Sequence, residues 1–204
     1  MTWEKLVERE GDFLKNYLLY ENYVENFNSV FNRNHSDFLT TRKGNTFTHY
    51  VHKLGGKEFS KFLKQQLEKN PNFLKEILKK GKENFEKLIK FAERINKINL
   101  QKFDNIGLKK TISEYFKLYK NPYPYFNVTV FSDELEDNQE AINIMAELRL
   151  LGRTNFNKTH ELIKPLFQEI GKRFNLRVEE IKFLKPQEII KIFKSFDYYC
   201  CYYH

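Results

Sequence analysis

Apolar side chains recur at spacings of three and four residues along this 204-residue chain, which is the period of an amphipathic helix. The clearest stripe lies within the segment 149–193 and consists of Leu162, Ile163, Leu166, Phe167 and Ile170. Gly171 to Asn175 then leads out of this helix, and a short Glu-rich turn follows. Pro186 stands near the first turn of a last amphipathic helix, where its missing N–H is tolerated. The pattern predicts a mainly α-helical fold, a multi-helix bundle.

Similar stripes predict the remaining helices. We expect a first helix from Thr2 to about Phe31, with Gly11 as a possible interruption. Further helices are expected over 57–70, 71–98, 107–119 and 140–151, the last of them leading to Gly152. The helices over 57–70 and 71–98 should pack antiparallel, and Gly81 should bend the second of them slightly.

The segment 37–52 changes period and predicts a small β-hairpin inserted into the helical domain. Its two halves are rich in β-branched and aromatic residues, and Lys43-Gly44-Asn45 supplies a turn between them. Two strands alone are marginal in water, so the hairpin must lie against helices or against a missing part of a larger protein. His49 and His52 fall on opposite faces of a strand, which argues against their sharing one metal ion.

The order of motifs resembles the helical region between the ATP-grasp and phosphohistidine domains of phosphoenolpyruvate synthase-like and rifampicin phosphotransferase-like enzymes. The run "LLGR…LFQEIGKRFNL…EEIKFLKPQEI" carries the resemblance. The matching positions are Arg153, Leu166, Lys172, Phe174, Ile181, Leu184, Pro186 and Glu188. The N-terminus agrees through a "W…RE…L" opening formed by Trp3, Arg9, Glu10, Phe13 and Leu14. In that family a helix also stands where this chain has the β-rich segment 125–131, and we expect a helix there.

The resemblance implies a helical accessory or substrate-recognition region, in which relatives build or cover a substrate site. Arg9, Arg149 and Arg153 would then contact an anion, or else form ordinary ion pairs. Tyr123 and Tyr125 could line a pocket between helices, because two prolines hold the backbone there, or could pack in the core.

The sequence predicts no catalytic residue and no resident cofactor. Eight scattered glycines form no Gly-rich loop, so ATP and Mg²⁺ are expected only through ATP-grasp and phosphohistidine domains on another chain. None of the five histidines has the Gly- and Thr/Ser-rich surroundings of a phosphohistidine. Acidic clusters such as Glu179-Glu180 are typical of solvated surfaces rather than of desolvated acid–base sites.

The net charge of +8 raises a second function class, the binding of nucleic acid. The positive charge is concentrated between Lys53 and Lys120, which holds 18 basic and 8 acidic residues. Only Arg94 in that stretch is an arginine, the residue that suits bidentate phosphate contacts. Glu-to-Lys pairs at spacing four, such as Glu86 and Lys90, indicate a solvated helix face. This basic 53–120 face could instead contact a protein partner or an acidic ligand.

Composition places the chain among folded proteins of the cytoplasm. The 20 phenylalanines and 12 tyrosines argue against disorder, and 204 residues suffice for one domain spanning 1–204. No apolar run could span a membrane, and the start lacks the pattern of a secretory signal. The two adjacent cysteines, Cys200 and Cys201, cannot link distant parts of the chain and sit in a Tyr-rich tail over 196–204 that we expect to be poorly ordered.

Two functional hypotheses follow. The first is an accessory or substrate-recognition module of a phosphotransferase of the resembled family, which binds a small-molecule or anionic ligand but does not catalyse alone. The alternative is a stand-alone helical module that binds protein or nucleic acid through the basic 53–120 face.

Overall fold

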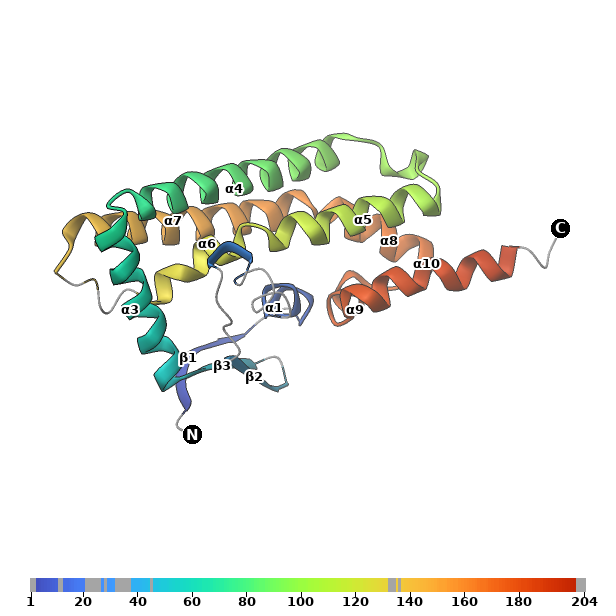
Figure 1. Cartoon of the computed structure of the whole chain (residues 1–204). Coiled ribbons are helices and arrows are strands. Elements are labelled where there is room, and N and C mark those ends of the chain that lie inside the picture. Colours follow the sequence, from blue (N-terminus) through green and yellow to red (C-terminus); the bar gives the residue numbers. More distant parts are fainter. Residues whose placement is uncertain are drawn as a thin grey trace.

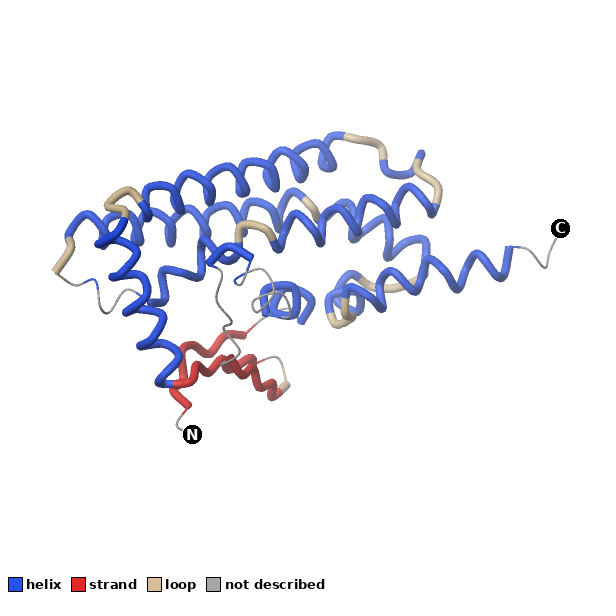
Figure 2. Tube along the Cα trace, in the orientation of Figure 1, coloured by secondary structure: helices blue, strands red, loops and turns tan. Residues whose placement is uncertain are grey.

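The computed structural model of the chain describes residues 3–10, 13–20, 27, 29–31, 38–44, 46–131, 135 and 137–200. Within these residues a bundle of helices lies beside a small antiparallel sheet (Figure 1). Figure 2 shows how strongly helix predominates over strand in the described part of the chain. The predicted class, a mainly α-helical bundle with a small β-hairpin, is confirmed.

Three long helices run side by side, α4 (Phe73–Lys97), α5 (Asn105–Lys120) and α7 (Gln139–Leu162) (Figure 1). A fourth, α3 (Lys53–Lys69), crosses from the sheet to the start of α4. Between α5 and α7 lie the short helix α6 (Tyr123–Asn127) and a 3₁₀ turn over Val128–Phe131. The segment 125–131 is therefore helical, as expected, in spite of its β-rich composition.

Helices α4 and α7 pack against each other in a parallel pair. Three ion pairs join them, Lys75 to Glu140 at 2.8 Å, Lys82 to Glu147 at 2.6 Å and Glu93 to Lys158 at 2.6 Å. In each pair the α7 residue follows its α4 partner by 65 positions. A constant offset requires that the two helices run in the same direction, and α5 and α6 carry the chain back between them (Figure 1).

The main partner of α4 is thus α7, and not α3 as the sequence suggested. Helix α3 follows the sheet directly, so its first turn is held there and it crosses toward α4 only at its far end (Figure 1). Helix α4 continues without a break through Gly81. A Cβ atom at Gly81 would lie 3.1 Å from Leu148 Cδ2 and 3.2 Å from Tyr125 Cβ, so this glycine allows α6 and α7 to approach α4 closely.

The sheet has three strands in the order β1-β3-β2, all antiparallel. The predicted hairpin is formed by β2 (Phe38–Lys43) and β3 (Thr46–His52), and Gly44 adopts a left-handed φ of 60° in the turn between them. The third strand, β1 (Trp3–Glu10), pairs with the other edge of β3.

The single helix expected over 2–31 was wrong for its first part, because residues 3–10 form β1. The hairpin alone would leave one edge of β3 without backbone partners, and two strands are marginal in water, so a third strand stabilises the sheet. The second part is helical, with α1 over Phe13–Tyr20. Gly11, the expected interruption, lies outside the described residues.

The C-terminal elements follow the predicted pattern in part. The stripe from Leu162 to Ile170, predicted as the face of one helix, is divided between the end of α7 and the next helix, because Pro165 lacks the N–H that a continuous helix needs. Helix α8 (Lys164–Phe174) ends where Asn175 adopts a left-handed conformation, and the Leu176 N–H donates to the Gly171 carbonyl at 2.9 Å. A short α9 (Val178–Lys182) follows, and α10 (Pro186–Cys200) begins at the predicted proline. The expected tail over 196–204 is described only as the backbone of α10 up to Cys200.

Helix α7 is longer than the sequence predicted, because it passes through Gly152 and ends at Leu162. Gly152 is buried against the ring of Phe126, a contact that favours glycine without requiring a helix end. Among the described residues, no helix is long and apolar enough to cross a membrane.

Candidate functional site

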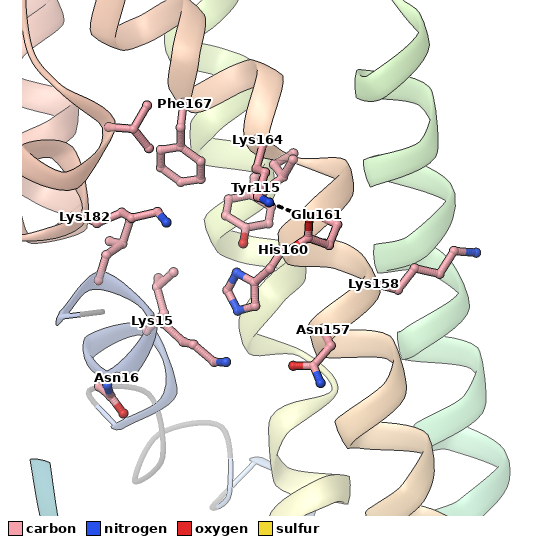
Figure 3. A pocket seen from close by; sticks show the side chains of 14 residues that line it. Lys15, Asn16, Tyr115, Asn157, Lys158, His160, Glu161, Lys164, Phe167 and Lys182 are labelled. Carbon is pink, nitrogen blue, oxygen red and sulfur yellow. Dashed lines mark hydrogen bonds and ion pairs between the residues drawn. The ribbon is translucent and has the colours of Figure 1, made fainter. Parts of the chain in front are cut away.

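A cavity of about 700 Å³ lies where α1, α5, α7, α8 and α9 meet (Figure 3). We call it the basic cavity because its lining includes the four lysines Lys15, Lys158, Lys164 and Lys182. The same lining includes one carboxylate, that of Glu161. Asn16, Asn157 and His160 are its neutral polar residues. Apolar and aromatic side chains form the rest of the wall, namely Leu14, Leu18, Tyr115, Ile163, Phe167 and Val178.

The break between α7 and α8 sets the geometry of the cavity. Pro165 lies in the first turn of α8. It has no N–H to donate to the Glu161 carbonyl, four residues earlier, so α7 cannot continue through it and ends at Leu162. Ile163 caps α7 with a bond from its N–H to the Thr159 carbonyl at 3.0 Å. His160 and Phe167, one on either side of this break, therefore face the same space.

Two of the four lysines are held by carboxylates. Lys164 pairs with Glu161 at 2.5 Å on the rim of the cavity. Lys158 reaches away from the cavity to Glu93 of α4, at 2.6 Å (Figure 3). The side chains of Lys15 and Lys182 lie on the side of the cavity that faces His160 (Figure 3). The described lining residues therefore include four lysines and one carboxylate.

His160 lies at the centre of this arrangement as a neutral imidazole. Its Nε2 atom is 3.0 Å from the hydroxyl oxygen of Tyr119, a fully buried residue of α5. Burial, and after it the nearby charges of Lys15 and Lys182, lower the pKa of His160 from 6.5 to about 3. An imidazole with so low a pKa is a poor proton shuttle near neutral pH, but it can donate or accept one hydrogen bond.

Aromatic rings support the back of the cavity. The rings of Tyr115 and Phe167 are 6.0 Å apart and nearly perpendicular, at 85°. Tyr115 also contacts Tyr119, with ring centroids 5.6 Å apart. Edge-to-face rings of this kind favour a fixed geometry, so the wall beside His160 is rigid.

Of the five residues that the sequence nominated, the four whose side chains are described do not line the basic cavity; these are Tyr123, Tyr125, Arg149 and Arg153. Tyr123 and Tyr125 are 4% and 9% exposed, so they pack in the core, the alternative that the sequence left open. Burial and then the charge of Glu83 raise the pKa of Tyr125. Arg149 is exposed on α7, and its Nη2 donates to the Thr129 carbonyl at 2.9 Å.

The remaining two nominated residues are Arg153 and Arg9. Arg153 lies one turn beyond Arg149 on the exposed face of α7. The backbone of Arg9 belongs to β1, opposite Phe47 of β3, and its side chain lies outside the described residues.

Sequence reasoning missed the residues that do converge. Lys15, His160 and Lys182 come from three elements that are far apart in the chain, and none belongs to a recognisable motif. His160 was considered only as a phosphohistidine and set aside for lack of glycine and serine or threonine around it. The one local signal is a histidine two positions before the apolar stripe that starts at Leu162.

The described residues contain no group of three or more His, Cys, Asp or Glu side chains that could hold a metal ion. His49 is buried in the sheet, with Nδ1 2.9 Å from the Thr40 hydroxyl oxygen. The side chain of His52 lies outside the described residues, so the predicted separation of the two histidines stays a prediction.

The basic 53–120 face is partly neutralised by carboxylates. The predicted pair between Glu86 and Lys90 is present at 2.5 Å. Lys75 and Lys82 bind carboxylates of α7, as described above, and Arg94 approaches Glu114 of α5 at 3.5 Å. These pairs reduce the positive potential that nucleic-acid binding would use.

The basic cavity has the chemistry of a recognition site. Its inward-facing groups are cationic or neutral, and its one carboxylate is paired with Lys164. Such groups suit contacts with a negatively charged molecule. Compared with protein-family models, with curated proteins and with solved structures, the chain matches none.

Proposed function

We propose that the chain is a recognition module that binds a small negatively charged molecule in the basic cavity. The observation that carries this proposal is the convergence of Lys15 and Lys182 on His160. Ammonium groups and neutral polar side chains at one cavity can donate hydrogen bonds to carboxylate or phosphate oxygens, and the described lining residues include four lysines and one carboxylate.

The resemblance noted in the sequence gives this proposal a biological setting. The chain would act as an accessory or substrate-recognition module of a phosphotransferase similar to phosphoenolpyruvate synthase. In that setting, ATP and Mg²⁺ would be bound by ATP-grasp and phosphohistidine domains on another chain, and this chain would hold the small-molecule partner. The exposed pair Arg149 and Arg153 would be a second contact for anions.

A calorimetric titration tests the proposal. Phosphate and acetate serve as probes, and each is titrated into the purified chain and into the variants Lys15→Met and Lys182→Met. Charged hydrogen bonds contribute roughly 1.5 to 3 kcal/mol each, so each variant should weaken binding about tenfold or more.

The matched control is Lys87→Met, which removes the same charge from the exposed face of α4, away from the cavity. The affinity of Lys87→Met for phosphate and for acetate should equal that of the unchanged chain. The variant Arg153→Met distinguishes anion binding in the basic cavity from anion binding at the exposed pair Arg149 and Arg153. The proposal is overturned if no anion binds, or if the cavity variants bind as tightly as Lys87→Met.

A further inference from the structure

The positive charge of α3 is not neutralised by ion pairs as the charge of α4 is. Lys57, Lys61 and Lys64 follow one another at spacings of four and three residues, which places them on one face of the helix. All three side chains are exposed, and none of them forms an ion pair with another described residue. Glu68, one turn beyond Lys64 on the same face, is not paired with it either. We call Lys57, Lys61 and Lys64 the lysine row.

An exposed aromatic side chain lies near the start of the lysine row. Trp3, the only tryptophan of the chain, is 38% exposed. In the register of the sheet Trp3 lies opposite His52, and α3 begins at the next residue, Lys53. Strand β1 therefore starts beside the first turn of α3 (Figure 1). An aromatic surface and a row of cations thus adjoin at this corner of the molecule.

A single-stranded nucleic acid carries the two kinds of group that this corner can bind. Its phosphates repeat along a flexible backbone, and ammonium groups contact them without reading the sequence. Its unpaired bases expose flat faces that stack on aromatic side chains. Helix α3 contains lysine and no arginine, which suits contacts with phosphates as point charges rather than the bidentate reading of bases.

The direction of the lysine row favours a strand over a flat lipid surface. Lys57 and Lys64 are separated by about 10 Å along the helix axis. Helix α3 leads away from the sheet toward α4, so the row leads away from Trp3 (Figure 1). A planar bilayer at Trp3 would reach only the start of the row, whereas a flexible strand can follow the helix.

We infer that a single-stranded nucleic acid binds at this corner, with its phosphates along the lysine row and one base stacked on Trp3. None of these residues lines the basic cavity. Binding of the strand is therefore separate from the proposed binding of a small anion, and the two can be tested independently.

Tryptophan fluorescence tests the stacking directly, because Trp3 is the only tryptophan. Titrating the whole chain with a single-stranded oligouridylate should quench this fluorescence as a base covers the indole. Polyphosphate carries the negative charges without bases and should bind without quenching. A duplex should also bind without quenching, because its bases are already stacked on one another.

Salt dependence tests the lysine row. In one variant, glutamine replaces all three lysines of the row, and anisotropy of a labelled oligouridylate measures the affinity. The variant should bind about tenfold more weakly or worse, and the slope of log affinity against log salt should fall by about 2, since each phosphate contact contributes about 0.7. The matched control carries three glutamines at exposed positions of α4 and should change the affinity less than about threefold. These positions are Lys80, Lys87 and Lys97.

Two substitutions at Trp3 complete the test. Trp3→Phe keeps an aromatic ring and should keep the affinity within about threefold, whereas Trp3→Ala should weaken binding about fivefold or more. Circular dichroism and thermal unfolding verify that both variants keep the sheet. The quenching experiment needs no substitution, so it tests the stacking even if Trp3→Ala disturbs β1.

Three results would overturn the inference. The first is that the oligouridylate does not bind, or binds equally well to the two triple variants. The second is binding without quenching, which would place the strand away from Trp3. The third is that vesicles containing phosphatidylserine shift the emission of Trp3 while the oligouridylate leaves it unchanged, which would identify a lipid surface as the partner. Titration of phosphate into the basic cavity tests the proposed function separately in each case.

Discussion

The ring of Phe126, on α6, lies so close to Gly152 of α7 that a methyl group on Gly152 would overlap it. The same ring makes an edge contact with Phe156 one turn further along α7, with centroids 5.9 Å apart. Gly152 therefore has a packing role in the middle of a helix, where glycine is otherwise unfavourable.

The variant Gly152→Ala should lower the free energy of unfolding by about 1 to 2 kcal/mol, because overpacking costs more than the better helix propensity of alanine returns. Urea denaturation followed by circular dichroism measures the change. Combining it with Phe126→Leu should relieve the overlap, so the double variant should lose less than the sum of the two single variants. Thr154→Ala, at an exposed position of the same helix, is the control and should be nearly neutral. Equal stability of Gly152→Ala and the unchanged chain would contradict the packing.

His160 should make the chain sensitive to acid. Its pKa is about 3 in the folded chain and should return to about 6.5 on unfolding. Between these values the unfolded state binds more protons, so the free energy of unfolding falls as pH is lowered from 6.5 toward 3, by roughly 1.4 kcal/mol per pH unit. At pH 4.5 the loss attributable to this residue should be about 2 to 3 kcal/mol.

The variant His160→Gln isolates this contribution, because glutamine does not titrate. Urea denaturation of both proteins at pH 7, 5.5 and 4.5 should show a smaller loss for the variant. Glu161 and Lys164 face the same cavity and are present in both proteins, so their contribution cancels in the comparison. Identical pH profiles would mean that the imidazole is not held neutral by its surroundings.

Arg173 joins α8 to the turn before α5. Its guanidinium donates to Glu169 Oε1 at 2.7 Å, to Asn105 Oδ1 at 3.3 Å and to the Leu100 carbonyl at 3.1 Å. Arg173→Lys cannot span these acceptors, because an ammonium lacks the planar fork, and should lower the free energy of unfolding by about 2 kcal/mol.

Thermal and urea unfolding of Arg173→Lys measure this effect. Lys172→Gln, at the exposed neighbouring position, removes a charge without touching the network and should change the stability by less than about 0.5 kcal/mol. If Arg173→Lys were as stable as the unchanged chain, the positive charge alone, and not the planar guanidinium, would hold α8 to the turn before α5.

Asn175 ends α8 with φ 54° and ψ 44°. Asn175→Gly should therefore be neutral or slightly stabilising, because glycine adopts this conformation without steric cost. Asn175→Val should lose about 1 to 2 kcal/mol, since a β-branched side chain is strained at positive φ. Urea denaturation of the two variants side by side measures the difference, and equal midpoints would exclude the left-handed cap.

Local signals were enough to predict where α8 ends and where α10 begins, but not the break at Ile163. Pro186 marks the start of α10, and the run from Gly171 to Asn175 marks the end of α8, because both depend on the conformation of a few neighbouring residues. The hairpin was predicted for the same reason, since its turn at Gly44 is encoded within two residues.

The sequence pattern did not predict the pairing of segments that are far apart in the chain. Residues 3–10 carry apolar side chains that fit a helical stripe, and only the open edge of β3, more than 35 residues later, makes them a strand. The residues of the basic cavity were not predicted for a related reason. Lys15, His160 and Lys182 are ordinary residues in their own segments, and their combination exists only once α1, α7 and α9 have met.

The parallel pairing of α4 and α7 has a consequence for how the protein is made. The contacts that join the two helices connect residues 65 positions apart, with α5 and α6 in between. During synthesis, α4 therefore cannot pack against α7 until α7 has been made. Until then the apolar face of α4 is exposed to solvent or covered by α5 alone. Synthesis past Leu162 is the point at which the central pair can close, so pauses in translation before it would prolong exposure of the aromatic core.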